Sequence, residues 1–83
     1  MTEIKSAFRD IAQRIENAES SFIADAQEQF GFTSEEATKI LRIYKKEKIV
    51  KVDPVMGVAR VSHGIFWEKE TMQNALKVAN GQL

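Results

Sequence analysis

The chain has 83 residues, 43% of them hydrophobic and 29% charged, and it contains no cysteine. This size and composition predict one globular domain over residues 1–83 with a small core, and they exclude disulfides and a zinc site of the usual thiolate kind. No apolar run approaches the roughly 18 to 20 residues of a membrane span, and the N-terminus lacks the basic start and apolar middle of a signal peptide, so we expect a cytoplasmic protein.

The charges are unevenly placed along the chain. Twelve basic and twelve acidic residues cancel over the whole sequence. Residues 1–32 carry three basic and six acidic residues, a net charge of −3, whereas residues 33–63 carry seven basic and four acidic residues, a net charge of +3. The positive charge is therefore concentrated in the central segment, and this asymmetry is more informative than the total.

An apolar stripe runs through the first part of the chain. Its members, at alternating steps of four and three, share one side of a helix; they are Ile4, Phe8, Ile11, Ile15, Ala18 and Phe22. We interpret the stripe as buried within the domain, because a small domain needs every apolar surface it has. The alternative is a dimer seam, although the stripe covers fewer than the three to four heptads that indicate a coiled coil.

Two serines interrupt the good helix formers of this segment. Ser20 and Ser21 are residue types that cap helices, so a second helix from there to Phe30 is one interpretation and a single continuous helix is the other. Phe22, Ile23, Ala26 and Phe30 would form its inner side. Gly31 follows, and it allows the chain to leave the helix in the left-handed conformation.

The next helix has a clear start signal. Thr33 stands at a predicted N-cap with Glu36 three positions later, the reciprocal arrangement of a capping box. The spacing beyond it predicts one buried stripe, made of Ala37, Ile40, Leu41 and Tyr44. Several of the remaining positions are basic, so this helix is expected to present cations on its surface.

The sequence pattern then changes from helix to strand. Residues 48–63 predict a β-hairpin, with β-branched residues on both sides of a turn over residues 53–57. The turn residues Val55 and Met56 are interpreted as facing solvent, the alternative being an apolar contact with a partner or the minor groove. After Gly64, the Phe66 and Trp67 side chains are expected to close the core rather than form an exposed patch, and a last helix ends at Asn80-Gly81.

No catalytic or cofactor signature accompanies these elements. Ser62, His63 and Asp53 include the residue types of a nucleophilic triad, but neighbouring residues of a strand point to opposite faces, so Ser62 and His63 do not approach each other. His63 is interpreted as a structural residue that ends the strand. The four glycines are isolated, without a phosphate-cradling motif. We therefore expect a protein that is not an enzyme and that has no metal or cofactor.

The order of elements in "FIADAQEQFGFTSEEATKILRIYKKEKIVKVDPVMGVARVSHG" resembles a winged helix-turn-helix domain. The resemblance implies an α+β, mainly α fold of three helices, a two-stranded hairpin wing and a C-terminal helix. Within it, residues 22–30 are similar to the positioning helix, residues 33–47 to the recognition helix and residues 48–63 to the wing. The chain also resembles small uncharacterised proteins of phages and plasmids that share a "GFT-x-EEA…VxHG" run, which implies a mobile-element origin.

The resemblance also implies a function and its residues. Winged-helix domains commonly place the recognition helix in the major groove of double-stranded DNA and the wing against phosphates or the minor groove. By position, the groove-facing residues are Thr33, Ser34, Thr38, Lys39 and Arg42, and the backbone-facing residues are Lys45, Lys46, Lys48, Lys51 and Arg60. The implied function is that of an accessory transcriptional regulator, acting as a homodimer.

A protein-interaction module, such as a phage-encoded inhibitor or adaptor of a host protein, is the alternative. Glu35 and Glu36 place two carboxylates at the start of the predicted recognition helix, where they repel phosphate. The chain is also neutral overall, whereas DNA-binding domains are typically basic. A third interpretation is a basic face that serves solubility alone.

Overall fold

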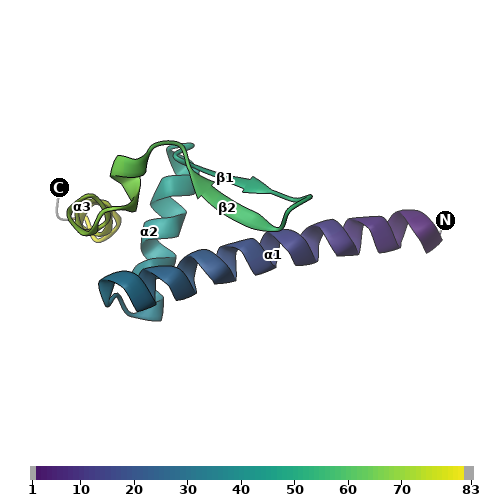
Figure 1. Ribbon diagram of the computed structural model, residues 1–83, viewed down its shortest axis with the longest axis horizontal. Coiled ribbons are helices and arrows are strands. Elements are labelled where there is room, and N and C mark those ends of the chain that lie inside the picture. The colour runs from purple at the N-terminus through teal and green to yellow at the C-terminus, as the bar shows by residue number, and fades with distance from the viewer. Residues whose placement is uncertain (1, 82–83) are drawn as a thin grey trace.

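The computed structural model describes the backbone of residues 2–81 and the side chains of residues 9–81. Its elements, in chain order, are α1 (Thr2–Phe30), α2 (Ser34–Lys46), β1 (Val50–Asp53), β2 (Val58–Val61), the 3₁₀ helix η1 (Gly64–Trp67) and α3 (Lys69–Ala79). The two strands pair as an antiparallel hairpin. The architecture is therefore α+β and mainly helical (Figure 1).

Helix α1 is continuous from Thr2 to Phe30, so the two-helix interpretation of this segment is wrong. Ser20 and Ser21 are exposed residues in its middle. A serine costs only about 0.5 kcal/mol relative to alanine inside a helix. Continuing the helix keeps the buried residues Ala18, Phe22 and Ala26 on one side, and this burial outweighs the weak preference of serine for a cap.

The connection between α1 and α2 follows the sequence signals closely. Gly31 has a φ of +75° and donates its N–H to the carbonyl of Gln27, which ends α1. Thr33 then caps α2: its Oγ1 accepts the N–H of Glu36 at 3.1 Å, and the Glu36 Oε1 accepts the N–H of Thr33 at 2.9 Å. The predicted capping box is confirmed.

The core lies where α1, α2, the hairpin and α3 meet. The predicted stripe of α2 is buried at every position, and α2 packs against both α1 and α3. The buried residues of the core cluster are Phe22, Ala26, Phe32, Ala37, Ile40, Leu41, Tyr44, Val50, Met72 and Ala75. Helix α2 thus occupies the centre of the fold, and only part of its surface faces solvent.

Two aromatic residues close this core from the segment after the hairpin, as expected. The Trp67 ring lies 5.1 Å from the ring of Phe22 and 5.4 Å from that of Phe30, in edge-to-face arrangements. The Phe66 ring lies 5.9 Å from that of Tyr44, and the Tyr44 hydroxyl donates to the Phe66 carbonyl at 2.7 Å. Both rings therefore pack on the core.

The hairpin register pairs Val50 with Val61, Lys51 with Arg60, Val52 with Ala59 and Asp53 with Val58. The Ser62 N–H donates to the Ile49 carbonyl at 2.7 Å, so hydrogen-bonded pairs alternate along the ladder from that point. Val55 and Met56 in the turn are exposed, as the sequence predicted. The turn runs along α1: a Cβ at Gly57 would lie 3.9 Å from the Cβ of Arg14.

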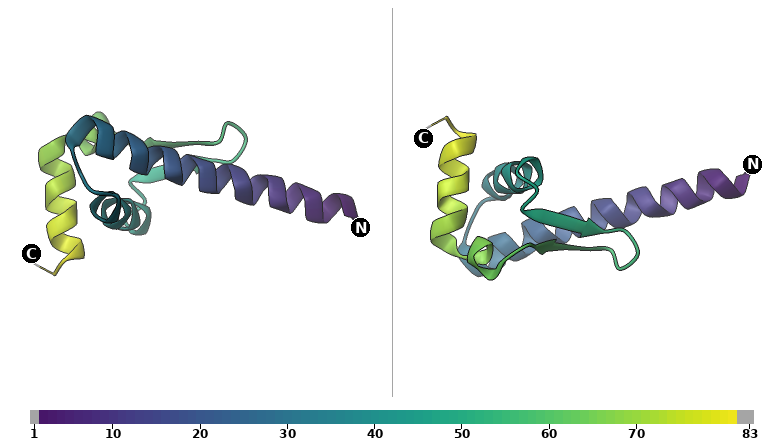
Figure 2. Two further views of the ribbon diagram at one scale, coloured as in Figure 1. Left: turned by 90° about the horizontal axis from the view of Figure 1, so that it is seen from below. Right: turned by 90° about the horizontal axis from the view of Figure 1, so that it is seen from above.

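The N-terminal part of α1 extends past the tip of the hairpin in all three views (Figures 1 and 2). The molecule is accordingly elongated, measuring 48 × 24 × 23 Å. The apolar stripe is buried at Ala18 and Phe22, half-buried at Ile15 and 42% exposed at Ile11. Burial of the whole stripe within the domain is therefore wrong at Ile11, because the hairpin covers only the later turns of α1; the side chains of Ile4 and Phe8 lie outside the described residues. Between residues 2 and 81, no helix combines the length and the apolar character needed to cross a bilayer.

Candidate functional site

The start of α2 uses its polar side chains within the protein. Thr33 and Glu36 are committed to the capping box, and the Thr38 Oγ1 donates to the Ser34 carbonyl at 2.7 Å. Lys39 Nζ donates to the Asn80 Oδ1 at 3.0 Å. It also lies 3.7 Å from the Glu35 carboxylate. Three of the five residues expected to face the major groove therefore have side chains with internal hydrogen bonds, namely Thr33, Thr38 and Lys39, whereas Ser34 contributes only its carbonyl.

The basic residues are divided between internal partners and solvent. Lys45 Nζ lies 2.5 Å from the Glu19 carboxylate of α1, and the Glu19 side chain is 29% exposed. This ion pair joins α1 to α2, so the Lys45 charge is partly neutralised within the fold. The cations that are exposed and make no ion pair with any residue from 9 to 81 include Arg42, Lys46, Lys48, Lys51 and Arg60.

Lys48 has an unusual backbone conformation that the sequence did not signal. Its φ is +58°, in the left-handed region that usually selects glycine. The Lys48 N–H donates to the Lys45 carbonyl and the Ile49 N–H to the Tyr44 carbonyl, which is the hydrogen-bond pattern of a Schellman motif after a helix. A lysine therefore occupies a strained position between α2 and β1 where glycine would be the ordinary choice.

Lys51 and Arg60 form a like-charge pair on the outward face of the hairpin. They are directly opposite each other in the register, and both are exposed. Like charges placed this way destabilise a strand pair. The nearby Asp53 carboxylate is already an acceptor for the N–H groups of Val55 and Met56, at 2.9 and 3.1 Å. Lys51 and Arg60 also line a shallow hollow of about 480 Å³, so this face is open to an anion.

Asp53, Ser62 and His63, the three residue types of a nucleophilic triad, take part in local hydrogen bonds of the backbone instead. The His63 Nδ1 accepts the N–H of Ile65 at 3.3 Å and caps η1, directly after β2, in agreement with the structural role expected for it.

Tyr44 is a titratable residue of the core, and burial of its hydroxyl raises its pKa to about 12. Its hydroxyl is a hydrogen-bond donor inside the core rather than a reactive group.

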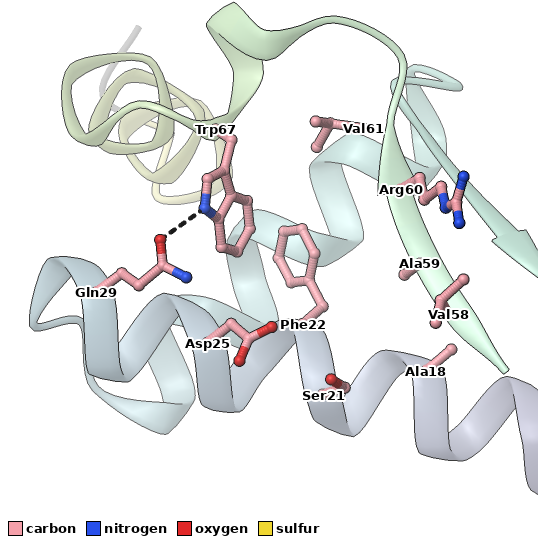
Figure 3. A pocket seen from close by; sticks show the side chains of 10 residues that line it. All are labelled: Ala18, Ser21, Phe22, Asp25, Gln29, Val58, Ala59, Arg60, Val61 and Trp67. Carbon is pink, nitrogen blue, oxygen red and sulfur yellow. Dashed lines mark hydrogen bonds between the residues drawn. The ribbon is translucent and has the colours of Figure 1, made fainter.

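A second feature lies between α1 and β2. A hollow of about 350 Å³, here called the α1–β2 groove, is lined on one side by Val58–Val61 and has Phe22 and Trp67 at its apolar floor (Figure 3). Ser21, Asp25 and Gln29 line it from α1, four positions apart and so along one ridge of the helix. The Gln29 Oε1 accepts the Trp67 Nε1–H at 2.9 Å. No local sequence pattern indicated this groove, because its α1 and β2 walls are about 30 to 40 residues apart in the sequence.

Among residues 9–81, no cluster of three or more histidine, aspartate or glutamate side chains is arranged to hold a metal ion. Comparison of the chain with protein-family models, with curated proteins and with solved structures finds no match.

Proposed function

We propose that this protein binds double-stranded DNA as a winged-helix-like, non-enzymatic accessory regulator of a mobile element. The binding surface consists of the exposed cations of α2, the α2–β1 connection and the hairpin: Arg42, Lys46, Lys48, Lys51 and Arg60. The observation that carries the proposal is the like-charge pair of Lys51 and Arg60. Two opposed cations with no carboxylate partner among residues 9–81 are unfavourable in the free protein, and a phosphate group between them would remove the repulsion.

The proposed contacts are mainly to phosphates rather than to base edges. The side chains of Thr33, Thr38 and Lys39 are engaged in the capping box or in hydrogen bonds to the Ser34 carbonyl and to Asn80, so they are poorly placed to reach bases. Arg42, one turn further along, remains the residue best suited to a base edge, since arginine donates in a planar fork. Binding dominated by phosphate contacts is strongly salt-dependent and only weakly sequence-specific.

Titration with a mixed-sequence duplex over a range of salt concentrations tests this proposal. If all five cations meet phosphates, the logarithm of the association constant should fall against the logarithm of salt with a slope of about −4 to −5. Arg42→Ala combined with Lys46→Ala should reduce that slope by about 2. Lys69→Ala with Lys77→Ala, two exposed cations of α3, is the matched control and should leave the slope unchanged. Absent or salt-insensitive binding would overturn the proposal.

Lys48→Gly is a further test, and it is a variant that should stabilise the fold rather than weaken it. Because Lys48 has a φ of +58°, glycine should raise the free energy of unfolding, by about 0.5–1 kcal/mol. The same change removes one cation, so the salt slope should fall by about 1. Urea denaturation and duplex titration of the same preparation measure both effects. An unchanged slope would remove Lys48 from the binding surface.

We further propose that the regulator acts as a homodimer joined through the exposed turns of α1. Ile11 is 42% exposed where α1 extends past the hairpin, and the stripe it belongs to continues from the core. Residues 9–16 carry two basic and two acidic side chains, so two copies of this segment do not repel each other. Most of the stability of a helix in a protein comes from packing of its amphipathic face, and a second copy would cover the exposed part of this stripe.

Molar mass in solution tests the dimer. Sedimentation equilibrium should give twice the chain mass for the unmodified protein, and Ile11→Glu should give a monomer because it places a charge in the seam. Gln13→Glu, an exposed position on another side of α1, is the control and should remain dimeric. A monomer in every case, with and without the duplex, would contradict the dimer and leave the DNA proposal to its own test.

A further inference from the structure

Strand β2 has an unpaired edge. The ladder alternation places Lys51 with Arg60 and Asp53 with Val58 as hydrogen-bonded pairs, so the N–H and C=O groups of Ala59 and Val61 point away from β1. Within residues 9–81, no hydrogen bond from another element satisfies these four groups. An open edge of this kind is a template for a further strand.

The α1–β2 groove borders that edge. Four consecutive residues of β2, from Val58 to Val61, line it, although alternate side chains of a strand face opposite ways. A hollow lined by consecutive strand residues contacts the backbone edge and not only one face. In Figure 3, the Arg60 guanidinium lies on the side of β2 nearer β1, whereas Phe22 and Trp67 lie on the other side, toward the groove.

The walls of the groove define the chemistry of an occupant. On the side facing α1, Phe22 and Trp67 offer an apolar floor, and the Asp25 carboxylate makes no ion pair with any described residue. On the opposite face of β2, the charged side chain that a further strand would lie beside is Arg60. A strand laid here would therefore place apolar and basic residues toward α1 and uncharged or acidic residues on the side of Arg60.

We propose that the α1–β2 groove binds an extended segment of another protein by strand addition to β2. The segment pairs its backbone with Ala59 and Val61, places an apolar side chain over Phe22, and directs a lysine or arginine to Asp25. The occupant is not β2 of a second copy, because pairing two β2 edges about their centre would place Arg60 beside its own symmetry mate. The groove shares Arg60 with the proposed DNA-binding surface, but its floor and its Asp25 wall lie outside that surface, so variants of Asp25 test strand addition separately from DNA binding.

The single tryptophan of the chain provides the readout, because Trp67 forms part of the groove. The probe is an acetylated and amidated peptide, Thr-Val-Thr-Lys-Thr-Val, titrated into the full chain while Trp67 fluorescence is recorded. We expect a saturable change. The same peptide with glutamate in place of lysine should bind about tenfold more weakly, because it brings like charges together at Asp25.

Backbone methylation distinguishes strand addition from nonspecific contact. A peptide N-methylated at the alternate amides that face β2 should lose binding, whereas one methylated at the intervening amides should keep it. Asp25→Lys should weaken binding of the lysine peptide about tenfold, and Glu28→Lys, an exposed residue of α1 that does not line the groove, should not. No saturable change, equal binding of the two methylated peptides, or an unaffected Asp25→Lys variant would each overturn the proposal.

Discussion

Phe22→Ala should lower the free energy of unfolding by about 3–5 kcal/mol, the usual cost of truncating a buried phenylalanine. The Phe22 side chain is only 4% exposed, and its ring lies 6.1 Å from that of Tyr44 and 5.1 Å from that of Trp67. It therefore joins α1, α2 and η1 at one point. A chain of this size has a total stability of about 4–12 kcal/mol, so the variant would lose a large fraction of it.

Urea denaturation followed by far-ultraviolet circular dichroism measures this effect. Val55→Ala is the control, because Val55 is 75% exposed in the hairpin turn and its truncation should change the unfolding free energy by less than about 0.5 kcal/mol. A loss below about 1 kcal/mol for Phe22→Ala would mean that α1, α2 and η1 do not share a packed core. The same variant would also remove the floor of the α1–β2 groove, so binding experiments should use Asp25 variants instead.

Stability should fall as the pH rises from about 10 to about 12, because of Tyr44. Burial raises its pKa to about 12 in the folded protein, above the ordinary value of 10.0. Between these values the unfolded chain has lost the phenolic proton and the folded chain retains it, so the unfolded state binds fewer protons and stability declines with pH. The contribution is fully present below pH 10, and its loss amounts to about 2–3 kcal/mol.

Tyr44→Phe isolates this effect from the titration of lysines in the same range. The variant should lose about 1 kcal/mol at neutral pH, because the Phe66 carbonyl loses its donor at 2.7 Å. Above pH 10 it should decline less steeply than the unmodified protein, since it has no phenol to ionise. Denaturation curves at pH 8, 10 and 11.5 give the comparison. Parallel pH profiles of the two proteins would contradict a raised pKa for Tyr44.

The sequence predicted those elements of the fold whose signals lie within a few neighbouring residues. The capping box of Thr33 and Glu36, the left-handed Gly31 and the hairpin depend on residues within a few positions of each other, and all are present. The continuity of α1 was left open by the sequence, because two exposed serines favour a cap only weakly. Burial of Phe22 and Ala26 beside Ala18 decided it, and that burial depends on α2 and the hairpin.

The candidate site could be predicted less well from the sequence, because the partners of its charged side chains are distant in the sequence. Lys45 is paired with Glu19, 26 positions away, and Lys39 bonds to Asn80, 41 positions away. Neither partner could be identified from the distribution of charged residues along the sequence. Lys48 gave no signal either, since a lysine normally avoids the left-handed conformation that the Schellman motif imposes on it.

The sequence by itself determined the α2 helix, the hairpin and the last helix in their order, the buried stripe of α2 and the concentration of positive charge after residue 32, because hydrophobic period, caps and composition are local properties. Tertiary structure alone decided which cations remain free, which end of α1 is exposed, and that β2 keeps an open edge beside a groove. Those outcomes depend on contacts between segments 20 to 40 residues apart, whose geometry is settled only when α1, α2 and the hairpin pack together.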